Sequence, residues 1–296
     1  MERPEASQAA PLVLADSDRI AIIAGSGRLP AALFEQVCQS SKVRPLLVAI
    51  AGEADDALAV AADRVMTIEE IGKLGPYLKK EGVTHATFAG GVSRRPAWYR
   101  FFPAPGILKL LPRAIRALGS GDDALLRIVT AYADQYGITV LGAHQLMPQL
   151  LAPEGTIGRV QPDRDDWIAI RAAWVAARAI GALDIGQAAI AFGSRAVALE
   201  GIEGTEGLLE RTAAMRHHGR LNSSRRGVLV KCCKPGQDTR MDLPSIGPQT
   251  VASAHAAGLS GIAVEAGLSL MLDIDEIRRE ADRLGLFVIG VSEAML

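Results

Sequence analysis

The residues best suited to chemistry lie close together in the stretch 231–248. Three cations and two carboxylates occur there within twelve residues: Lys231, Lys234, Asp238, Arg240 and Asp242. If residues 238–242 are extended, alternation places Asp238, Arg240 and Asp242 on one side of the chain. Carboxylates bind a hard divalent cation and the basic side chains bind phosphate, so this composition can hold both together. A surface loop of ordinary ion pairs is an equally good interpretation of the same residues.

A buried strand must come directly before this stretch. Residues 227–230 read Gly-Val-Leu-Val, and Pro235, Pro244 and Pro248 exclude a continuous helix after them. Ligands of open α/β sheets bind beyond the carboxyl ends of strands. The sequence therefore predicts a loop at a strand end that presents charged side chains to a ligand.

Strands and helices alternate along the first half of the chain. Strands are expected at 20–24, 45–50, 64–68, 84–89 and 138–141, and helices at 30–39, 71–80 and 121–136. In the second half, Gly193-Ser194 separates two short apolar runs and indicates a hairpin. We therefore expect an α/β protein with two α/β domains, a Rossmann-like one with a parallel sheet at 18–150 and a mixed-sheet catalytic one at 151–296, after a flexible tail at 1–17.

Composition narrows the class of protein. The chain has 296 residues and a formal net charge of −1, which argues against a dedicated nucleic-acid binder. Its three cysteines form no disulfide framework and fit a reducing compartment. No apolar run reaches the ~18 residues that span a bilayer, and residues 1–17 lack the positive charge of a signal peptide. These features predict a cytoplasmic protein.

The first expected strand runs into Gly25-Ser26-Gly27. Such a turn before a helix can present backbone N–H groups to a phosphate or a sugar hydroxyl. A dinucleotide fingerprint would need a third glycine where Pro30 stands, although Glu53 could bind a ribose after the second strand. A tight turn with no ligand is the remaining interpretation.

Aromatic and basic residues mix in the segment 94–116. The segment could pack on the sheet, line a groove for acyl chains with Trp98, Phe101, Phe102 and Leu108, or rest on an anionic membrane surface. Asp122 and Asp123 follow it at an expected helix start. The helix dipole is enough to explain them, and metal ligation is the alternative.

Several stretches together resemble one family. They are 23–30, 88–94, 121–127, 183–187, 203–206 and, most specifically, Lys-Pro-Gly-Gln-Asp-Thr-Arg-Met-Asp-Leu-Pro at 234–244. These resemble the UDP-2,3-diacylglucosamine pyrophosphatase family of the LpxI type, over about 20–291. Ser26 departs from the family pattern, in which a third consecutive glycine is common, and the residues before Asp18 are extra.

The resemblance implies a two-domain enzyme of lipid A biosynthesis that encloses its substrate between the domains. It implies Mg²⁺-dependent hydrolysis, with Mn²⁺ as an alternative, of UDP-2,3-diacylglucosamine to UMP and 2,3-diacylglucosamine 1-phosphate (lipid X). Water attacks the phosphorus on the nucleoside side. Asp242 is then the essential aspartate and a metal ligand together with Asp122 and Asp123. Asp238 is a second catalytic carboxylate, whether as metal ligand, base or partner of Arg240.

The same resemblance suggests which residues contact the substrate. They are Gly25, Ser26, Gly27, Lys231, Lys234, Gln237, Arg240, Thr205 and Glu206, with Trp98, Phe101, Phe102 and Leu108 for the acyl chains. Because the substrate is a lipid, peripheral contact with the inner membrane is a further expectation. A homodimer is an open alternative to a monomer. The rival hypotheses are an NAD(P)-binding oxidoreductase with a partial Rossmann site and a non-catalytic sugar-nucleotide or lipid-binding protein.

Overall fold

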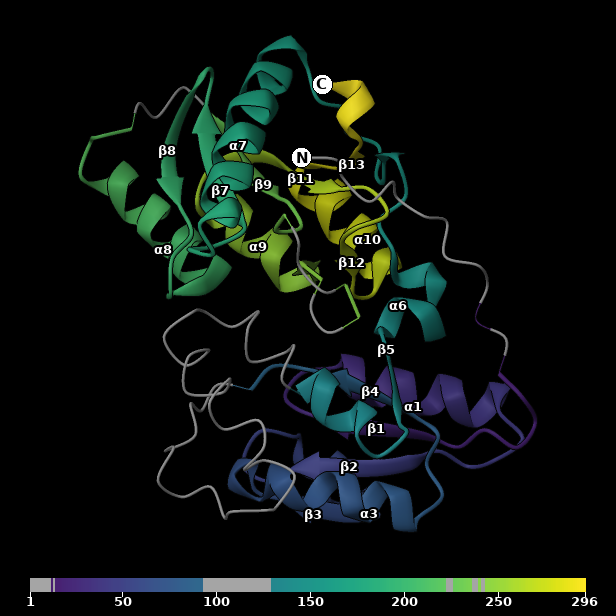
Figure 1. The fold of residues 1–296 in the computed structure, drawn as a ribbon. Helices are drawn as coiled ribbons and strands as arrows, with labels where there is room; N and C mark the ends of the chain where they lie inside the picture. The colour runs from purple at the N-terminus through teal and green to yellow at the C-terminus, as the bar shows by residue number, and fades with distance from the viewer. Residues whose placement is uncertain (1–11, 13, 93–128, 222–225, 236–238, 241–242) are drawn as a thin grey trace. The chain divides into compact units, whose positions relative to one another are not determined.

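The computed structural model describes residues 12, 14–92, 129–221, 226–235, 239–240 and 243–296 (Figure 1). The chain divides into two compact units, Met1–Pro148 and Gln149–Leu296. From the sequence we place the boundary between two domains at residue 150. That boundary stays a prediction.

The first unit contains a parallel sheet of five strands. The strands are β1 (Ile20–Ala24), β2 (Leu46–Ile50), β3 (Arg64–Met66), β4 (His85–Ala89) and β5 (Thr139–Leu141), in the spatial order β3-β2-β1-β4-β5. The helical elements are α1 (Leu29–Ser40), α2 (Asp56–Ala61), η1 (Ile68–Lys73), α3 (Leu74–Lys80) and α6 (Ala143–Leu146). Every residue of β1 and β2 is buried, as expected for parallel strands covered on both faces. The strand order reverses between β1 and β4, and ligands of doubly wound sheets bind at such a point.

The short helix η3 (Pro148–Leu150) crosses the division between the units. The second unit contains a mixed sheet in the order β6-β13-β11-β9-β7-β8. Its strands are β6 (Gly155–Thr156), β7 (Ala188–Phe192), β8 (Arg195–Leu199), β9 (Gly227–Lys231), β11 (Leu259–Glu265) and β13 (Phe287–Val291). A separate small pair joins β10 (Ser245–Ile246) to β12 (Leu270–Met271). The helical elements are α7 (Arg164–Ala182), α8 (Gly204–His217), α9 (Pro248–Ala256), α10 (Ile274–Leu284) and η4 (Glu293–Met295). The predicted fold class, with a parallel sheet in one part and a mixed sheet in the other, is confirmed.

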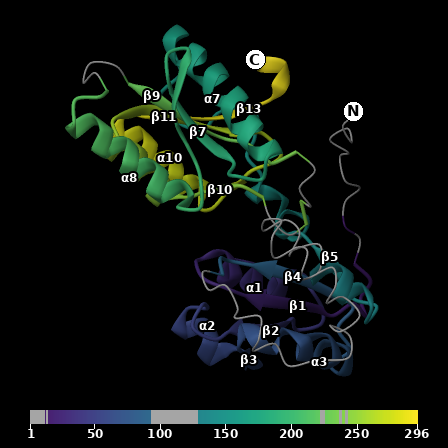
Figure 2. The ribbon, with the colours of Figure 1, turned by 60° about the vertical axis from the view of Figure 1, so that its left-hand side comes forward.

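Helices cover both faces of the second sheet, and Figure 2 shows α7 and α8 on opposite sides of it. On one face, Ile170 and Ala173 of α7 pack against Val228 of β9. On the other face, helices α8, α9 and α10 bury apolar residues such as Leu208 and Ile277. The alternation of inward-facing residues along β9 supplies both cores.

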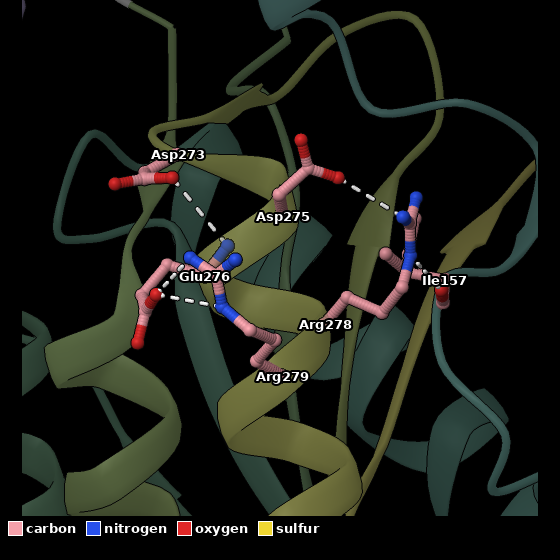
Figure 3. Close-up of polar contacts among 6 residues, drawn as sticks. All are labelled: Ile157, Asp273, Asp275, Glu276, Arg278 and Arg279. Carbon is pink, nitrogen blue, oxygen red and sulfur yellow. Dashed lines mark hydrogen bonds and ion pairs between the residues drawn. The ribbon is translucent and has the colours of Figure 1, made fainter.

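Side chains fix the helix starts and the outer contacts of this unit. Asp273 accepts the N–H of Glu276 at the start of α10, and Arg278 donates to the carbonyl of Ile157 at 3.0 Å (Figure 3). Asp163 accepts the N–H of Asp166 at the start of α7. Such caps satisfy N–H groups that have no partner within the helix. The helices are therefore anchored at defined points around the sheet.

Candidate functional site

Two glycine loops pair with each other at the carboxyl edge of the first sheet. The N–H of Gly25 donates to the carbonyl of Ala89 at 2.8 Å, and the N–H of Ser26 donates to Gly91 at 2.8 Å. Gly91 donates back to the carbonyl of Ser26 at 3.1 Å, and the Ser26 hydroxyl donates to the Gly91 carbonyl at 3.0 Å. The loop after β1 and the loop after β4 are therefore one hydrogen-bonded unit.

This pairing reduces the number of backbone N–H groups with which the first loop could bind a phosphate. The N–H groups of Gly25 and Ser26 point into the second loop, so these two donors are already used within the protein. Gly27 adopts a φ of +91°, a left-handed conformation that favours glycine, and α1 begins two residues later. The predicted substrate contact of Gly25, Ser26 and Gly27 stays a prediction.

Two titratable residues follow the carboxyl ends of β2 and β5, two strands of this sheet that β1 and β4 separate. Glu53 comes shortly after β2 and is buried. His144 follows β5 in α6, and burial lowers the pKa of its imidazole below the usual 6.5. A neutral imidazole at pH 7 can donate one hydrogen bond and accept another. The sequence analysis did not single out His144, although its place directly after a strand was the available signal.

In the second unit, the ends of the charged stretch 232–244 are held together. Lys231 is the last residue of β9 and only 6 % exposed, and its Nζ donates to the carbonyl of Ser245 at 2.9 Å. Ser245 begins β10, and the N–H of Leu270 in β12 donates to the carbonyl of Pro244 at 2.8 Å. The stretch is thus a loop with fixed ends at the carboxyl end of β9. The predicted phosphate contact of Lys231 stays a prediction.

A buried carboxylate lies at the start of this loop. Glu265 ends β11, is 8 % exposed and accepts the N–H of Cys233 at 2.9 Å. Nη1 of Arg178 in α7 lies 3.3 Å from Oε1 of Glu265. Burial raises the pKa of the Cys232 thiol well above its usual value, and the Glu265 carboxylate raises it further. Cys232 is therefore a protonated, buried side chain, in agreement with a packing role.

The two described cations within the loop differ in their surroundings. Nζ of Lys234 donates to Oδ1 of Asp184 at 2.7 Å, and both side chains are more than two-thirds buried. Arg240 is exposed and lies with Thr239 in a turn. The extended conformation that we considered for 238–242 is therefore absent at these two residues. A role of Lys234 and Arg240 in phosphate binding stays a prediction.

Thr205 and Glu206 lie in the first turn of α8, where each side chain has a partner. The Thr205 hydroxyl donates to Oε1 of Glu200 at 2.7 Å, and buried Glu200 also accepts the N–H of Gln187 at 2.8 Å. Glu206 is exposed and accepts a hydrogen bond from Ser253 at 2.7 Å. These contacts explain the local structure, and the predicted substrate contacts of Thr205 and Glu206 stay predictions.

The remaining predicted site residues lie outside the described residues. They are Asp238, Asp242 and Gln237 of the loop, Asp122 and Asp123, and Trp98, Phe101, Phe102 and Leu108. Among the residues that the structure describes, no group of three or more His, Cys, Asp or Glu side chains could hold a metal ion. Within the same residues, no helix is both long and apolar enough to cross a bilayer.

The fold and these edges define a class of protein. Each unit is an α/β unit that brings loops and polar side chains to the carboxyl ends of its parallel strands. That is where α/β proteins of this kind bind their ligands. The chain is thus a two-part α/β protein with a candidate ligand-binding edge in each part.

Comparison with known proteins identifies the family. The model of the LpxI N-terminal domain matches residues 19–150, and that of the LpxI C-terminal domain matches residues 153–289. The UDP-2,3-diacylglucosamine pyrophosphatase LpxI of Caulobacter vibrioides is 39 % identical over 274 residues, which cover 92 % of this chain and 97 % of that protein. The chain belongs to the LpxI family.

Proposed function

We propose that this protein hydrolyses the diphosphate bond of UDP-2,3-diacylglucosamine to UMP and 2,3-diacylglucosamine 1-phosphate, a step of lipid A biosynthesis. The observation that carries the proposal is family membership across both units, because the Caulobacter relative bears the name of this activity. The fixed ends of the charged loop at the carboxyl end of β9 support it. The cytoplasm, with contact at the inner membrane where the lipid lies, is the proposed location.

The reaction replaces one phosphorus–oxygen bond by another. The oxygen of water bonds to the phosphorus on the uridine side, and the bond from that phosphorus to the bridging oxygen breaks. The bridging oxygen leaves with the lipid monophosphate, and the proton of water passes to a base such as Asp238. Lys231, Lys234 and Arg240 would hold phosphate oxygens, because cations offset the charge that repels an attacking oxygen.

The proposal includes a divalent cation. Asp242, Asp122 and Asp123 offer only carboxylate oxygens, a donor set that suits Mg²⁺ or Mn²⁺. When bound, such an ion supplies charge neutralisation at the diphosphate. Removal by EDTA, followed by addition of Mg²⁺ or Mn²⁺, tests this part of the proposal through loss and recovery of UMP release.

Hydrolysis in H₂¹⁸O tests both the activity and the position of attack. The protein is incubated with UDP-2,3-diacylglucosamine and Mg²⁺, and both products are analysed by mass spectrometry. We expect one ¹⁸O atom in UMP and none in the lipid monophosphate. Label in the lipid product would contradict attack on the uridine side, and intact substrate would contradict the activity.

Trp98, Phe101, Phe102 and Leu108 are proposed to contact the acyl chains, because they lie in the most amphipathic and most aromatic part of the sequence. Trp98→Ala and Phe102→Ala should then raise KM for the diacyl substrate more than KM for a short-chain analogue. Equal effects on both substrates would instead assign these residues to the protein core.

The order of the first sheet keeps one rival function testable. A parallel β3-β2-β1-β4-β5 sheet with a glycine turn after β1 is compatible with a dinucleotide site. Against it, Gly25 and Ser26 use their N–H groups within the protein, and Pro30 occupies the place of a third glycine. Energy transfer from the protein to NADH on titration would favour this rival over the hydrolase.

A further inference from the structure

The chain that leaves β9 is held by two elements distant in sequence, the last turns of α7 and the end of β11. Cys233 and Lys234 are the first residues of the loop that carries the proposed catalytic carboxylates. Both are contacted by charged side chains that no step of the proposed reaction uses. The contacts of these charged side chains indicate which part of the loop each side chain holds in place.

The first contact is the pair of Glu265 and Arg178. Oε2 of Glu265 accepts the backbone N–H of Cys233 at 2.9 Å, while Nη1 of Arg178 lies 3.3 Å and 3.5 Å from the two carboxylate oxygens. The same Nη1 lies 3.5 Å from the carbonyl of Cys233. A buried carboxylate is costly unless it is paired and hydrogen-bonded. Here the pair encloses a backbone group, so the ion pair fixes the direction in which the chain leaves the strand.

The second contact is the pair of Asp184 and Lys234. Asp184 follows α7 and adopts a φ of +53°, which is uncommon for a residue other than glycine. Its Oδ1 accepts a hydrogen bond from Nζ of Lys234 at 2.7 Å. A flexible lysine side chain loses most of its rotamer freedom in such a largely buried pair. Asp184 therefore sets where the ammonium of Lys234 lies.

The third contact is steric. A Cβ atom added at Gly181 in the last turn of α7 would lie 3.3 Å from Cδ of Pro235 and 3.5 Å from Cα of Lys234. A glycine at this point lets the helix lie directly against the loop backbone. The end of α7 thus supports the loop through Arg178, Gly181 and Asp184, which lie about one helical turn apart.

We propose that Glu265, Arg178 and Asp184 are positioning residues for the reaction, because they fix the start of the loop 232–244. The inference rests on the proposed function, since the loop carries the carboxylates and cations to which that function is assigned. None of the three touches the reacting atoms in this assignment. They act by holding Cys233 and Lys234 in one defined geometry, and small displacements of a catalytic group are costly to turnover.

Glu265→Gln tests the first contact. Glutamine keeps the size and one acceptor for the Cys233 N–H but removes the charge that orients Arg178. We expect kcat, measured per folded enzyme, to fall about tenfold with KM within about twofold of the unaltered protein. Hydrogen exchange should become faster in peptides covering 232–244 and stay unchanged in peptides of β9.

Glu280→Gln is the matched control. Glu280 also pairs with an arginine, Arg283, at 2.8 Å and 2.6 Å, but on α10. Unchanged kcat and loop exchange in this control, together with changes in Glu265→Gln, would support the proposal. Normal kcat and normal loop exchange in folded Glu265→Gln would overturn the role of the Glu265–Arg178 pair.

Asp184→Asn tests the second contact. If Glu265→Gln does not fold, this variant by itself tests the positioning role. Asparagine tolerates a positive φ, so the backbone should remain in place. We expect kcat/KM to fall about fivefold, mainly through KM, and we expect no further loss when the change is made in a Lys234→Met background. An equal loss in both backgrounds would show that Asp184 does not act through Lys234 and would overturn this part.

The tests separate this inference from the proposed function. If the unaltered protein releases no UMP, the proposed function fails, while the exchange measurement on Glu265→Gln still reports whether the pair holds the loop. If the unaltered protein is active and all variants match it in rates and exchange, the positioning role fails and the function stands.

Discussion

The two carboxyl edges of this molecule are built by different means. At the edge of the first sheet, the loops after β1 and β4 are joined by backbone hydrogen bonds between Gly25, Ser26, Ala89 and Gly91. At the edge of the second sheet, the loop after β9 is held by side-chain charges, among them Glu265 and Asp184. The first edge depends mainly on the close approach of two backbones, and the second depends on charged side chains.

The difference teaches where each edge tolerates change. A backbone-paired edge has little room, because an ideal Cβ at Gly25 would lie 2.4 Å from the carbonyl oxygen of Gly91. The second edge is held by charged side chains, so it accommodates substitutions of similar shape. Its loop should lose its fixed position when one of these charges is removed. Size should therefore matter most at the first edge and charge at the second.

The largest expected effect is at the second edge. Asp242→Asn should lower kcat by a factor on the order of 10³, while the fold and UMP binding persist. The reason is that the proposed metal ion or attacking water would lose the carboxylate that holds it. Circular dichroism and equilibrium dialysis check fold and binding. Asp275→Asn, at an exposed surface pair, is the control and should retain full activity. Near-normal turnover in Asp242→Asn would remove the catalytic assignment of this edge.

The next effect tests the first edge. Gly25→Ala should destabilise the protein by roughly 1–3 kcal/mol, since the new methyl group meets backbone that cannot move freely. Urea unfolding followed by circular dichroism measures this. Gly91→Ala is the matched control, because among the described residues its Cβ would meet only the Ser26 hydroxyl, at 3.0 Å, rather than backbone. Equal stability of the two variants would break the contrast between the edges.

A smaller effect is expected at Thr205, where stability and KM distinguish a structural role from contact with the substrate. Thr205→Val should destabilise the protein by about 1 kcal/mol, because buried Glu200 loses a hydrogen-bond donor. Thr205→Ser retains the hydroxyl and should restore the unfolding midpoint. If Thr205 also contacts the substrate, KM should rise in the valine variant alone. A valine variant with unchanged midpoint would show that the bond to Glu200 contributes little.

The smallest effect concerns a charge in the first unit, at the amino end of its strands. Burial alone would raise the pKa of Asp63, but the N–H of Leu47 and the guanidinium of Arg44 outweigh it and lower the pKa below 3.8. The ionised form therefore stabilises the fold above pH 3.8, and this contribution is lost as the pH falls through the lowered pKa.

Asp63→Asn should accordingly cost a few tenths of a kcal/mol at pH 7, as expected for a partly exposed pair. The difference from the unaltered protein should shrink as the pH is lowered from 5 toward 2 in urea titrations. A difference that is constant over this range would assign the effect to packing rather than charge.

Much of the fold followed from local pattern. Continuous apolar runs such as 20–24 predicted buried strands, and Gly193-Ser194 predicted the hairpin of β7 and β8, which pair antiparallel. The short strands β6, β10 and β12 were not predicted, because two residues carry no periodic signal and pair only once the larger sheet has formed. The helix that we expect at 250–257 begins two residues earlier, at Pro248, since proline suits the first turn of a helix.

The sequence by itself determined most of the longer elements, their buried faces and the resemblance to a family, and it marked the stretch after residue 230 as the place for charged chemistry. Only the tertiary structure decided the partners of that stretch. Ser26 and Gly91 are 65 residues apart, Asp184 and Lys234 are 50 apart, and Cys233 and Glu265 are 32 apart. Such contacts follow from the order of strands in a sheet, which residue types and local periodicity do not encode, because each strand pairs through backbone groups that all residues share.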